Sequence, residues 1–309
     1  MGYYLGVDGG GTKTTAVVAD ETGKLLASVC GKSINYYSNP YEVARQNFRA
    51  LIEQTGVRAF SSAVIGMSAL SERADDGTAA DFVRGILTAE HLVMTSDVEI
   101  ALNSTGTDGA RAVLICGTGS MAAAVDGTGR QFHAGGWGYL LGDEGSGYAV
   151  ALNAIRKVLA HWGDLPEDPL TGVFRSFFRV DTESDILERF YDPPMPRDEL
   201  AAFCKPAMDA YRAGSRMARE VVEAEAASAA VLAERILAKL PANAPLFLYG
   251  GLFEHDPEYV RLLNDRLPQK AGLLPYPPVI GALIDAARSG GITPDENFYH
   301  QINERRDAL

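Results

Sequence analysis

The chain has 309 residues, more than one hydrophobic core usually serves, so we expect two domains. Its 47% hydrophobic and 22% charged residues are typical of a globular protein, and no apolar run approaches the ~20 residues of a membrane span. A net charge of −12 excludes the basic surface that nucleic acid or an anionic membrane needs.

Cysteine usage excludes a further group of functions. Cys30, Cys116 and Cys204 are scattered along the chain and form no CxxC pair, so we expect neither a disulfide framework nor a zinc or iron–sulfur site. Together with the apolar pattern, this predicts a cytoplasmic, soluble protein.

The first 110 residues predict an α/β domain. Strands, turns and helix caps give the order βββαβαβα. The expected strands cover 3–8, 13–20, 25–29, 62–67 and 92–95, and the expected helices cover 39–54, 78–87 and a segment from Asp97.

The pattern restarts at Arg111 as an internal repeat with an offset of 106 residues. Gly11-Thr12 aligns with Gly117-Thr118, and the turn Thr22-Gly23-Lys24 aligns with Thr128-Gly129-Arg130. Chance similarity of two hairpins is the alternative.

The rest of the second half is richer in helix. Helices are expected over 148–162, 198–240 and 278–288 and from Asp256, with a strand over 246–249. We therefore expect domains at 1–110 and 111–309, the second with helical additions and with its last helix able to pack back on the first.

Two glycine turns are candidate phosphate sites. In Asp8-Gly9-Gly10-Gly11-Thr12-Lys13, glycines with positive φ would point backbone N–H groups at an anion. Gly117-Thr118-Gly119-Ser120-Met121-Ala122 fits the dinucleotide fingerprint, but the turn at 126–129 leaves room for a strand and not for the required helix. We expect two facing hairpins that clamp the β- and γ-phosphates; plain hairpins are the alternative.

Two carboxylates have the positions that phosphoryl transfer requires. Asp97 follows a strand and opens a helix, where a base could accept a hydroxyl proton, although an N-cap role is an equal alternative. Asp8 ends the first strand beside the phosphate turn and suits Mg²⁺, which takes few protein carboxylates.

Two further glycine-rich segments suggest ligand contacts. The segment 135–147 holds six glycines around Trp137 and the pair Asp143-Glu144, a combination suited to a polyol. Gly250-Gly251 follows a strand and would let the backbone approach a flat ring such as adenine, although a plain helix-entry turn is the alternative.

These motifs, in this order, resemble the N-acetylglucosamine kinase group of the BadF/BadG/BcrA/BcrD-type ATPases, which share a superfold with other sugar kinases, Hsp70 and actin. The resemblance covers nearly the whole chain. It is carried by Gly6-Val7-Asp8-Gly9-Gly10-Gly11-Thr12, Ser33-Ile34-Asn35, Thr95-Ser96-Asp97, Ile115 to Ser120 and the segment from Gly135 to Ser146.

The resemblance implies two actin-like (ribonuclease H-like) domains, ATP and Mg²⁺ as cofactors, and a homodimer. The residues that it places at ATP, together with the glycine turns, are Gly10, Gly11, Thr12, Lys13, Thr118, Gly119, Gly250, Gly251 and, beside adenine, Ala201. The residues that it places at the sugar are Asn35, Ser68, Asp97, Ser120, Gly136, Trp137, Gly138 and Asp143.

The function expected from this resemblance is ATP-dependent phosphorylation of an amino sugar, N-acetylglucosamine at O6. Glucosamine, N-acetylmuramic acid or another hexose are alternative substrates, because Ser215 and Met121 depart from residues common in relatives. An ATPase activator of a radical dehydratase is the alternative of a different class, and it is disfavoured because it needs paired cysteines at a dimer interface.

Overall fold

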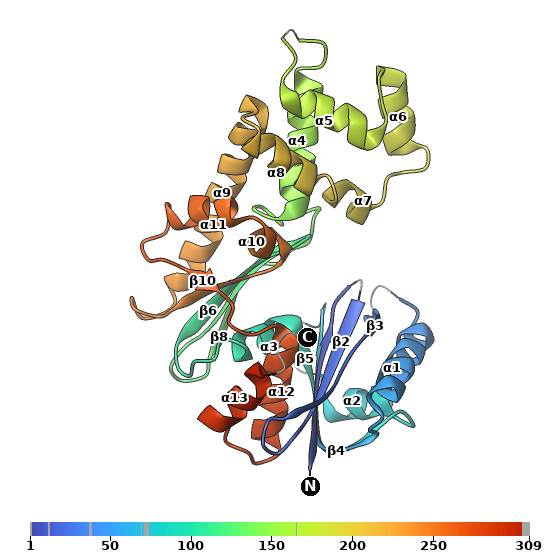
Figure 1. Cartoon of the computed structure of the whole chain (residues 1–309), viewed down its shortest axis with the longest axis vertical. Coiled ribbons are helices and arrows are strands. Elements are labelled where there is room, and N and C mark those ends of the chain that lie inside the picture. Colours follow the sequence, from blue (N-terminus) through green and yellow to red (C-terminus); the bar gives the residue numbers. More distant parts are fainter. Residues whose placement is uncertain are drawn as a thin grey trace. The chain divides into compact units, whose positions relative to one another are not determined.

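The computed structural model describes residues 2–11, 13–36, 39–68, 70, 74–164 and 166–304. The contacts within the chain divide it into two units, one formed by 1–107 with 274–309 and the other by 108–273 (Figure 1). The two helices after residue 273 therefore belong with the first unit, whereas the expected second domain extended to residue 309.

The first unit is built on a five-stranded sheet with the order β3-β2-β1-β4-β5. The neighbours β1, β4 and β5 are parallel, and β1, β2 and β3 form an antiparallel meander. The strands are β1 (Tyr3–Gly9), β2 (Lys13–Asp20), β3 (Leu25–Lys32), β4 (Ala59–Met67) and β5 (Thr88–Ser96). The helices are α1 (Tyr41–Thr55), α2 (Asp76–Val83), α3 (Asp97–Asn103), α12 (Pro278–Ser289) and α13 (Glu296–Asn303).

Helices cover both faces of this sheet (Figure 1). Leu5 and Val7 of β1 pack with the buried residues of α1 and α2, while their neighbour Tyr4 packs with those of α12 and α13. This follows from the period of two in a strand, which points successive side chains to opposite faces. Because both faces are covered, the central strands β1, β2 and β4 are buried along most of their length rather than alternating.

Helix α12 comes unusually close to its neighbours. A Cβ added at Gly6 would lie 2.5 Å from the backbone nitrogen of Leu283, and one added at Gly281 would lie 1.9 Å from the carbonyl oxygen of Ile100. These two glycines let α12 lie directly against β1 and α3, so a segment distant in sequence completes the first unit.

The second unit has its own five-stranded sheet, with the order β10-β9-β6-β7-β8. Its strands are β6 (Arg111–Cys116), β7 (Ser120–Val125), β8 (Gln131–Gly135), β9 (Leu246–Tyr249) and β10 (Gly272–Leu273). Its helices are α4 (Gly147–Ala160), α5 (Pro169–Phe178), α6 (Glu183–Tyr191), α7 (Arg197–Ala201), α8 (Cys204–Arg212), α9 (Arg216–Leu237), α10 (Gly251–His255) and α11 (Pro257–Asn264).

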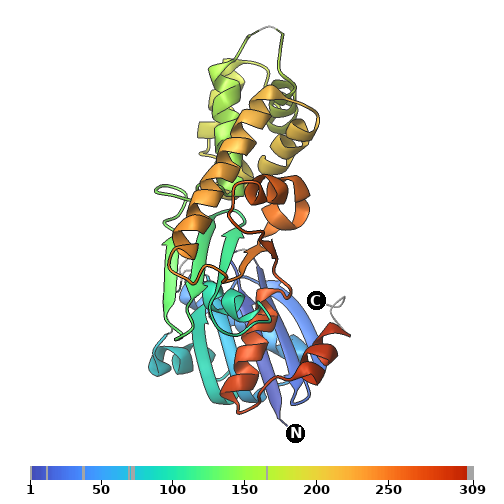
Figure 2. The same cartoon turned by 90° about the vertical axis from the view of Figure 1, so that its left-hand side faces the viewer.

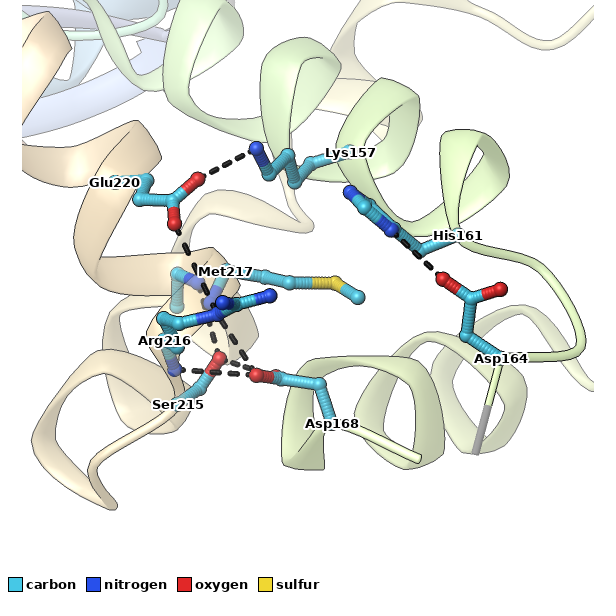
Figure 3. A network of polar contacts seen from close by, with 9 residues as sticks. Lys157, His161, Asp164, Asp168, Ser215, Arg216, Met217 and Glu220 are labelled. Atoms are coloured by element: carbon cyan, nitrogen blue, oxygen red, sulfur yellow. Dashed lines mark hydrogen bonds and ion pairs between the residues drawn. The ribbon is translucent and has the colours of Figure 1, made fainter. Parts of the chain in front are cut away.

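The helices of the second unit share one apolar core with its sheet. Helices α4 and α9 lie side by side (Figure 1, Figure 2). The start of α9 is tied to the start of α5 by Asp168, whose carboxylate accepts hydrogen bonds from Leu170, Ser215, Arg216 and Met217 (Figure 3). One side chain therefore caps two helices that are separated in sequence.

The internal repeat is present at the level of individual hydrogen bonds. In each unit an aspartate accepts from the backbone N–H and the hydroxyl of a threonine two positions later, at 2.9 and 2.6 Å in the first turn and 2.8 and 2.6 Å in the second. It also accepts from the N–H four positions later. The residues are Asp20, Thr22 and Lys24, and, 106 positions on, Asp126, Thr128 and Arg130.

The expected α/β fold class with two actin-like domains is confirmed, and β7 is a strand, as the rejection of the dinucleotide fingerprint required. The sequence patterns missed β8, β10, α5, α6, α10 and α13. Several of these are short or amphipathic segments next to Pro, Gly and Asp, where turn residues hide the periodicity. Among the helices that the structure describes, none is long and apolar enough to cross a membrane.

Candidate active site

The carboxyl ends of the parallel strands in the first unit bring two acidic residues to one edge. In the sheet register, Asp8 of β1 pairs with Gly66 of β4, which pairs with Thr95 of β5. Two strand spacings separate Asp8 from Thr95, about 10 Å, and Asp97 follows two residues after Thr95. Ligands of open α/β sheets bind at this edge.

The Asp97 side chain is not the cap of its helix. Ser96 is the N-cap of α3, and its hydroxyl accepts the backbone N–H of Glu99 at 3.1 Å. Asp97 is the next residue, where the partial positive charge of the helix start favours a carboxylate. Burial raises the pKa of Asp97, and the N–H groups of Val98 and of Asp97 itself oppose this rise. Because Ser96 caps the helix, the Asp97 carboxylate is available to accept a proton.

Asp8 is the more strongly perturbed of the two carboxylates. Burial and, to a lesser extent, the negative charge of Asp97 raise the pKa of Asp8 to about 7, and Lys13 acts in the opposite direction. Two neighbouring, partly buried carboxylates form an oxygen-rich group, in which Lys13 is the positive charge that acts on Asp8. A hard divalent cation such as Mg²⁺ fits this donor set, since it binds one or two carboxylates and retains water.

Asn35 and Ser68, both expected at the sugar, are in direct contact. The Asn35 side-chain amide donates to the Ser68 hydroxyl at 3.0 Å, and the Ser68 N–H donates to the carbonyl of Gly9 at 2.9 Å. Asn35 is 5% exposed and also receives a hydrogen bond from the Asn39 amide at its carbonyl oxygen. These hydrogen bonds connect two candidate sugar-binding residues to the end of β1.

The first glycine turn differs from its expected backbone geometry. Gly10 and Gly11 do not adopt a left-handed φ, and neither do Gly117 and Gly119 in the second turn. The Gly10 N–H donates to the carbonyl of Lys13 at 3.0 Å, which closes a hairpin instead of a nest. A Cβ would be crowded at Gly10 and Gly119, whereas it would meet no atom within 4 Å at Gly11 and Gly117. Thr12 lies outside the described residues.

A cavity of about 730 Å³ lies in the second unit. Its size is that of a small-molecule site. Three residues expected at the nucleotide, Thr118, Ala201 and Gly251, line it from three different segments of the chain. The remaining lining residues are Gly117, Gly147, Asp198, Ala202, Cys204, Lys205, Arg212, Leu252, His255 and Asp256.

Backbone contacts shape this cavity around the second glycine turn. The N–H groups of Gly147 and Tyr148, at the start of α4, donate to the carbonyls of Gly117 and Thr118 at 2.8 and 3.2 Å. Gly250 has φ +111, and a Cβ there would lie 2.5 Å from the carbonyl oxygen of Cys116. Only glycine fits at Gly250, which explains why the Gly250-Gly251 pair follows β9.

The segment 135–147, here called the glycine-rich loop, has positive φ at several residues. Gly135, Gly136, Gly138 and Gly145 all have φ between +74 and +78, and Asp143 has φ +65. Positive φ is uncommon for a residue other than glycine, and such residues gather at functional sites. Asp143 is also 4% exposed, so a buried carboxylate stands at a strained position.

Ser120 connects this loop to β7. Its N–H donates to the Asp143 carboxylate at 3.2 Å, and its hydroxyl donates to the carbonyl of Glu144 at 2.7 Å. The Gly136 N–H donates to the Ser120 carbonyl at 3.1 Å. Three of the residues expected at the sugar in this unit, Ser120, Asp143 and Gly136, therefore form one hydrogen-bonded group.

Trp137 does not join that group within its unit, because its side chain is 73% exposed. Gly138 accepts the N–H groups of Leu141 and Gly142, which makes the tip of the loop a tight turn. Leu140 and Leu141 at this tip are each 79% exposed.

Several supporting residues were missed from the sequence. Arg197 pairs with Asp143 at 2.9 Å. Gly145 donates its N–H to the carboxylate of Glu225 at 2.8 Å and accepts the hydroxyl of Tyr259 at 2.8 Å. Each partner lies more than 50 positions from the loop, so no local motif could reveal it; a buried glutamate on the apolar side of α9 was the one available signal.

The cysteines are placed unfavourably for a shared cluster. Cys116 is fully buried in β6, and burial raises its thiol pKa strongly. Cys204 lines the cavity, and burial raises its pKa to about 12. The burial of these two thiols disfavours a cluster shared between subunits, which a dehydratase activator requires.

The sequence of the chain also matches a known protein family. The model of the BadF/BadG/BcrA/BcrD ATPase family matches residues 5–286. The chain belongs to this family. The expected resemblance is thus confirmed over most of the sequence.

Named relatives are kinases of amino sugars. An N-acetyl-D-glucosamine kinase of Dictyostelium discoideum is 28% identical over 289 residues, covering 86% of this chain and 89% of that protein. An N-acetylmuramic acid/N-acetylglucosamine kinase of Clostridium acetobutylicum is 26% identical over 230 residues, covering 72% of this chain and 75% of that protein.

A solved structure has the same fold as this chain. A provisionally assigned N-acetylglucosamine kinase of Chromobacterium violaceum superposes with a TM-score of 0.71 at 23% identity, covering 92% of this chain and 98% of that one. The match supports the arrangement of elements described above.

Proposed function

We propose that this protein is an ATP-dependent kinase that phosphorylates an amino sugar, with N-acetylglucosamine as substrate and its O6 hydroxyl as acceptor. The observation that carries the proposal is Asp97, a partly buried carboxylate at the carboxyl edge of the sheet that is not used as a helix cap. Membership of an ATPase family and the names of the relatives support the nucleotide and the sugar.

In the proposed reaction, the sugar O6 attacks the γ-phosphorus of ATP while Asp97 accepts the hydroxyl proton. A new bond forms between O6 and the γ-phosphorus, the bond to the bridging oxygen of the β-phosphate breaks, and ADP leaves. Catalysis of this kind relies on positioning and electrostatics more than on covalent chemistry. The raised pKa of Asp97 makes it a stronger base than an exposed aspartate.

Other residues have supporting roles in the proposal. Asp8 would hold Mg²⁺, which neutralises phosphate charge. The cavity lined by Thr118, Ala201 and Gly251 would hold the adenosine end of ATP. The glycine turns would contact phosphates through Gly10, Gly11, Thr12, Lys13 and Gly119.

Each unit offers one polar group suited to sugar hydroxyls. In the first unit this group is formed by Asn35 and Ser68, and in the second unit by Ser120 and Asp143. Sites built from buried hydrogen-bonding groups reject analogues that leave those groups unpaired. The homodimer and the cytoplasmic location stay predictions.

The test is ADP release with MgATP and each of N-acetylglucosamine, glucosamine, N-acetylmuramic acid, N-acetylmannosamine and glucose. We expect the fastest release with N-acetylglucosamine, no release with its 6-deoxy analogue, and a product in which ³¹P couples to the C6 protons. Failure of every sugar to accelerate ADP release would refute the kinase proposal.

The base is tested separately with Asp97→Asn. We expect turnover to fall by about 10²- to 10⁴-fold, because the proton acceptor is lost, with ADP affinity retained. Asp164→Asn is the control, since Asp164 is exposed on the helical side and pairs only with His161 in the hydrogen bonds described. Near-normal turnover by Asp97→Asn would show that another group is the base.

A further inference from the structure

Arg197 holds Asp143 by more than one contact. It is the first residue of α7, and its terminal nitrogen Nη2 donates to Oδ2 of Asp143 at 2.9 Å. The guanidinium lies 5.1 Å from the Tyr139 ring centre and 5.7 Å from that of Tyr148. Charge pairing and cation–π contacts fix the orientation of an arginine in a way that a lysine does not reproduce.

Asp143 depends on this arginine for its placement. It is 4% exposed, and its other oxygen accepts the Ser120 N–H at 3.2 Å. A buried carboxylate is tolerated only when it is paired and hydrogen-bonded. Gly119 leaves room for the pair, because a Cβ there would lie 2.8 Å from the Asp143 carboxylate and 3.1 Å from Arg197.

The helix that carries Arg197 also forms a wall of the cavity. Asp198 and Ala201, both on α7, line it. A ligand in the cavity therefore contacts the same five-residue helix that holds Asp143 in the glycine-rich loop. Helix α7 has no side-chain cap at its start, so neighbouring contacts have to fix its position.

We propose that Arg197 is a positioning residue for Asp143 and that α7 couples occupancy of the nucleotide cavity to the order of the glycine-rich loop. Nucleotide bound against Asp198 and Ala201 fixes α7, α7 holds Arg197 on Asp143, and Asp143 is then aligned to accept a sugar hydroxyl. The last step rests on the proposed kinase function, whereas the first two concern only nucleotide and protein.

Such coupling is reciprocal. If ADP tightens the binding of the sugar, the sugar tightens the binding of ADP by the same factor, and factors of about 5 to 150 are usual. Removal of Arg197 would reduce the factor toward 1 while leaving the cavity walls intact. A purely structural arginine would instead change stability without changing the coupling.

The variants are Arg197→Met, Arg197→Lys and, as the matched control, Arg189→Met. Arg189 of α6 pairs with Glu199, which is also on α7, but does not contact the glycine-rich loop in the ion pairs described. The control thus removes an arginine–carboxylate pair that anchors the same helix. Circular dichroism and thermal melting establish that each variant is folded.

The first measurement is hydrogen exchange of full-length protein with and without MgADP, in the absence of sugar. The amides whose exchange is measured are the Ser120 N–H and the backbone N–H groups of the glycine-rich loop, residues 135–147. We expect MgADP to slow exchange at these amides in wild type and in Arg189→Met, less in Arg197→Lys, and not in Arg197→Met. Equal slowing in Arg197→Met, or none in wild type, would overturn the proposal whether or not the protein is a kinase.

The second measurement uses N-acetylglucosamine. For Arg197→Met we expect the sugar KM to rise about tenfold, within the usual range of coupling, while the ADP Kd without sugar stays within about twofold. Arg197→Lys should recover part of this loss. An unchanged sugar KM with normal turnover would refute the role of Arg197, whereas absence of turnover in wild type would refute the kinase proposal alone.

Discussion

At the residue scale, the sites are made of polar side chains held by other polar side chains. Asp97 is free of the capping role because Ser96 performs it, and Asn35 is oriented by Ser68. Asp143 is held by Ser120 and Arg197. In each case the candidate functional group is buried or partly buried, so its partner decides where it points.

The Asn35–Ser68 contact gives a prediction at this scale. Ser68→Ala removes the acceptor of the Asn35 amide, and we expect the sugar KM to rise about 3- to 10-fold because one hydrogen bond is worth roughly 1 kcal/mol. The ATP KM should change little. Steady-state kinetics with varied sugar and ATP measure both. Ser104→Ala, which removes a buried hydroxyl bonded to the Ala101 carbonyl, is the control, and an unchanged sugar KM in Ser68→Ala would contradict the assignment.

At the element scale, ends of helices and strands do most of the positioning. Strands β1, β4 and β5 end together and place Asp8 and Asp97 at one edge. The start of α4 is bonded to the second glycine turn, and α7 joins the cavity to the loop. Element ends carry unpaired backbone groups, so they are natural places for ligands and caps.

Asp168 gives a prediction about two such ends. Its carboxylate caps α5 and receives two N–H groups and the hydroxyl at the start of α9 (Figure 3). Burial would raise its pKa, but these hydrogen bonds outweigh burial and hold the pKa below the ordinary 3.8. Asp168→Asn keeps one acceptor oxygen but loses the charge and the second acceptor, so it should lower the free energy of unfolding by about 1 kcal/mol at neutral pH.

The sign of the pH dependence follows from the lowered pKa. The contribution of Asp168 is fully present above pH 3.8 and is lost as the pH falls through the still lower folded value. The difference in unfolding free energy between wild type and Asp168→Asn should be constant from pH 7 to about 5 and shrink below 3.8. Urea unfolding over this range measures it, with Asp164→Asn as control; a difference that grew at low pH would refute the assignment.

At the scale of the whole molecule, the chain leaves the first unit, completes the second and returns. The second unit is one continuous segment, 108–273, and contains the entire cavity. The first unit needs α12, whose buried residues Val279, Ile280 and Leu283 cover one face of its sheet. The second unit is therefore formed by one continuous segment, whereas the first unit needs two segments that are distant in sequence.

This difference predicts the behaviour of fragments. Residues 108–273 alone should fold cooperatively and bind ADP, because their core and cavity are internal. Residues 1–107 alone should not fold, since an apolar face is left bare, whereas 1–107 joined by a short linker to 274–309 should. Thermal melting by circular dichroism and ADP titration test this. A folded 1–107 fragment would contradict the role of α12.

Local signals in the sequence determined a large part of this protein. The strand order of the first half, the repeat, the turns at 22–24 and 128–130, and the acidic residues at strand ends can all be read from it, because short-range patterns encode strands, turns and caps. The same patterns exposed the false dinucleotide fingerprint. The resemblance to a kinase family, and not these patterns, indicated Asn35, Ser68 and Ser120.

Only the tertiary structure decided which residues hold those groups in place. Arg197 lies 54 positions from Asp143, and Glu225 lies 80 positions from Gly145. The return of α12 to the first sheet and the space-filling role of Gly119 likewise depend on distant neighbours. Local patterns indicate the secondary structure of one segment. The burial of a charge or the close approach of two backbones depends instead on distant parts of the chain that pack against that segment.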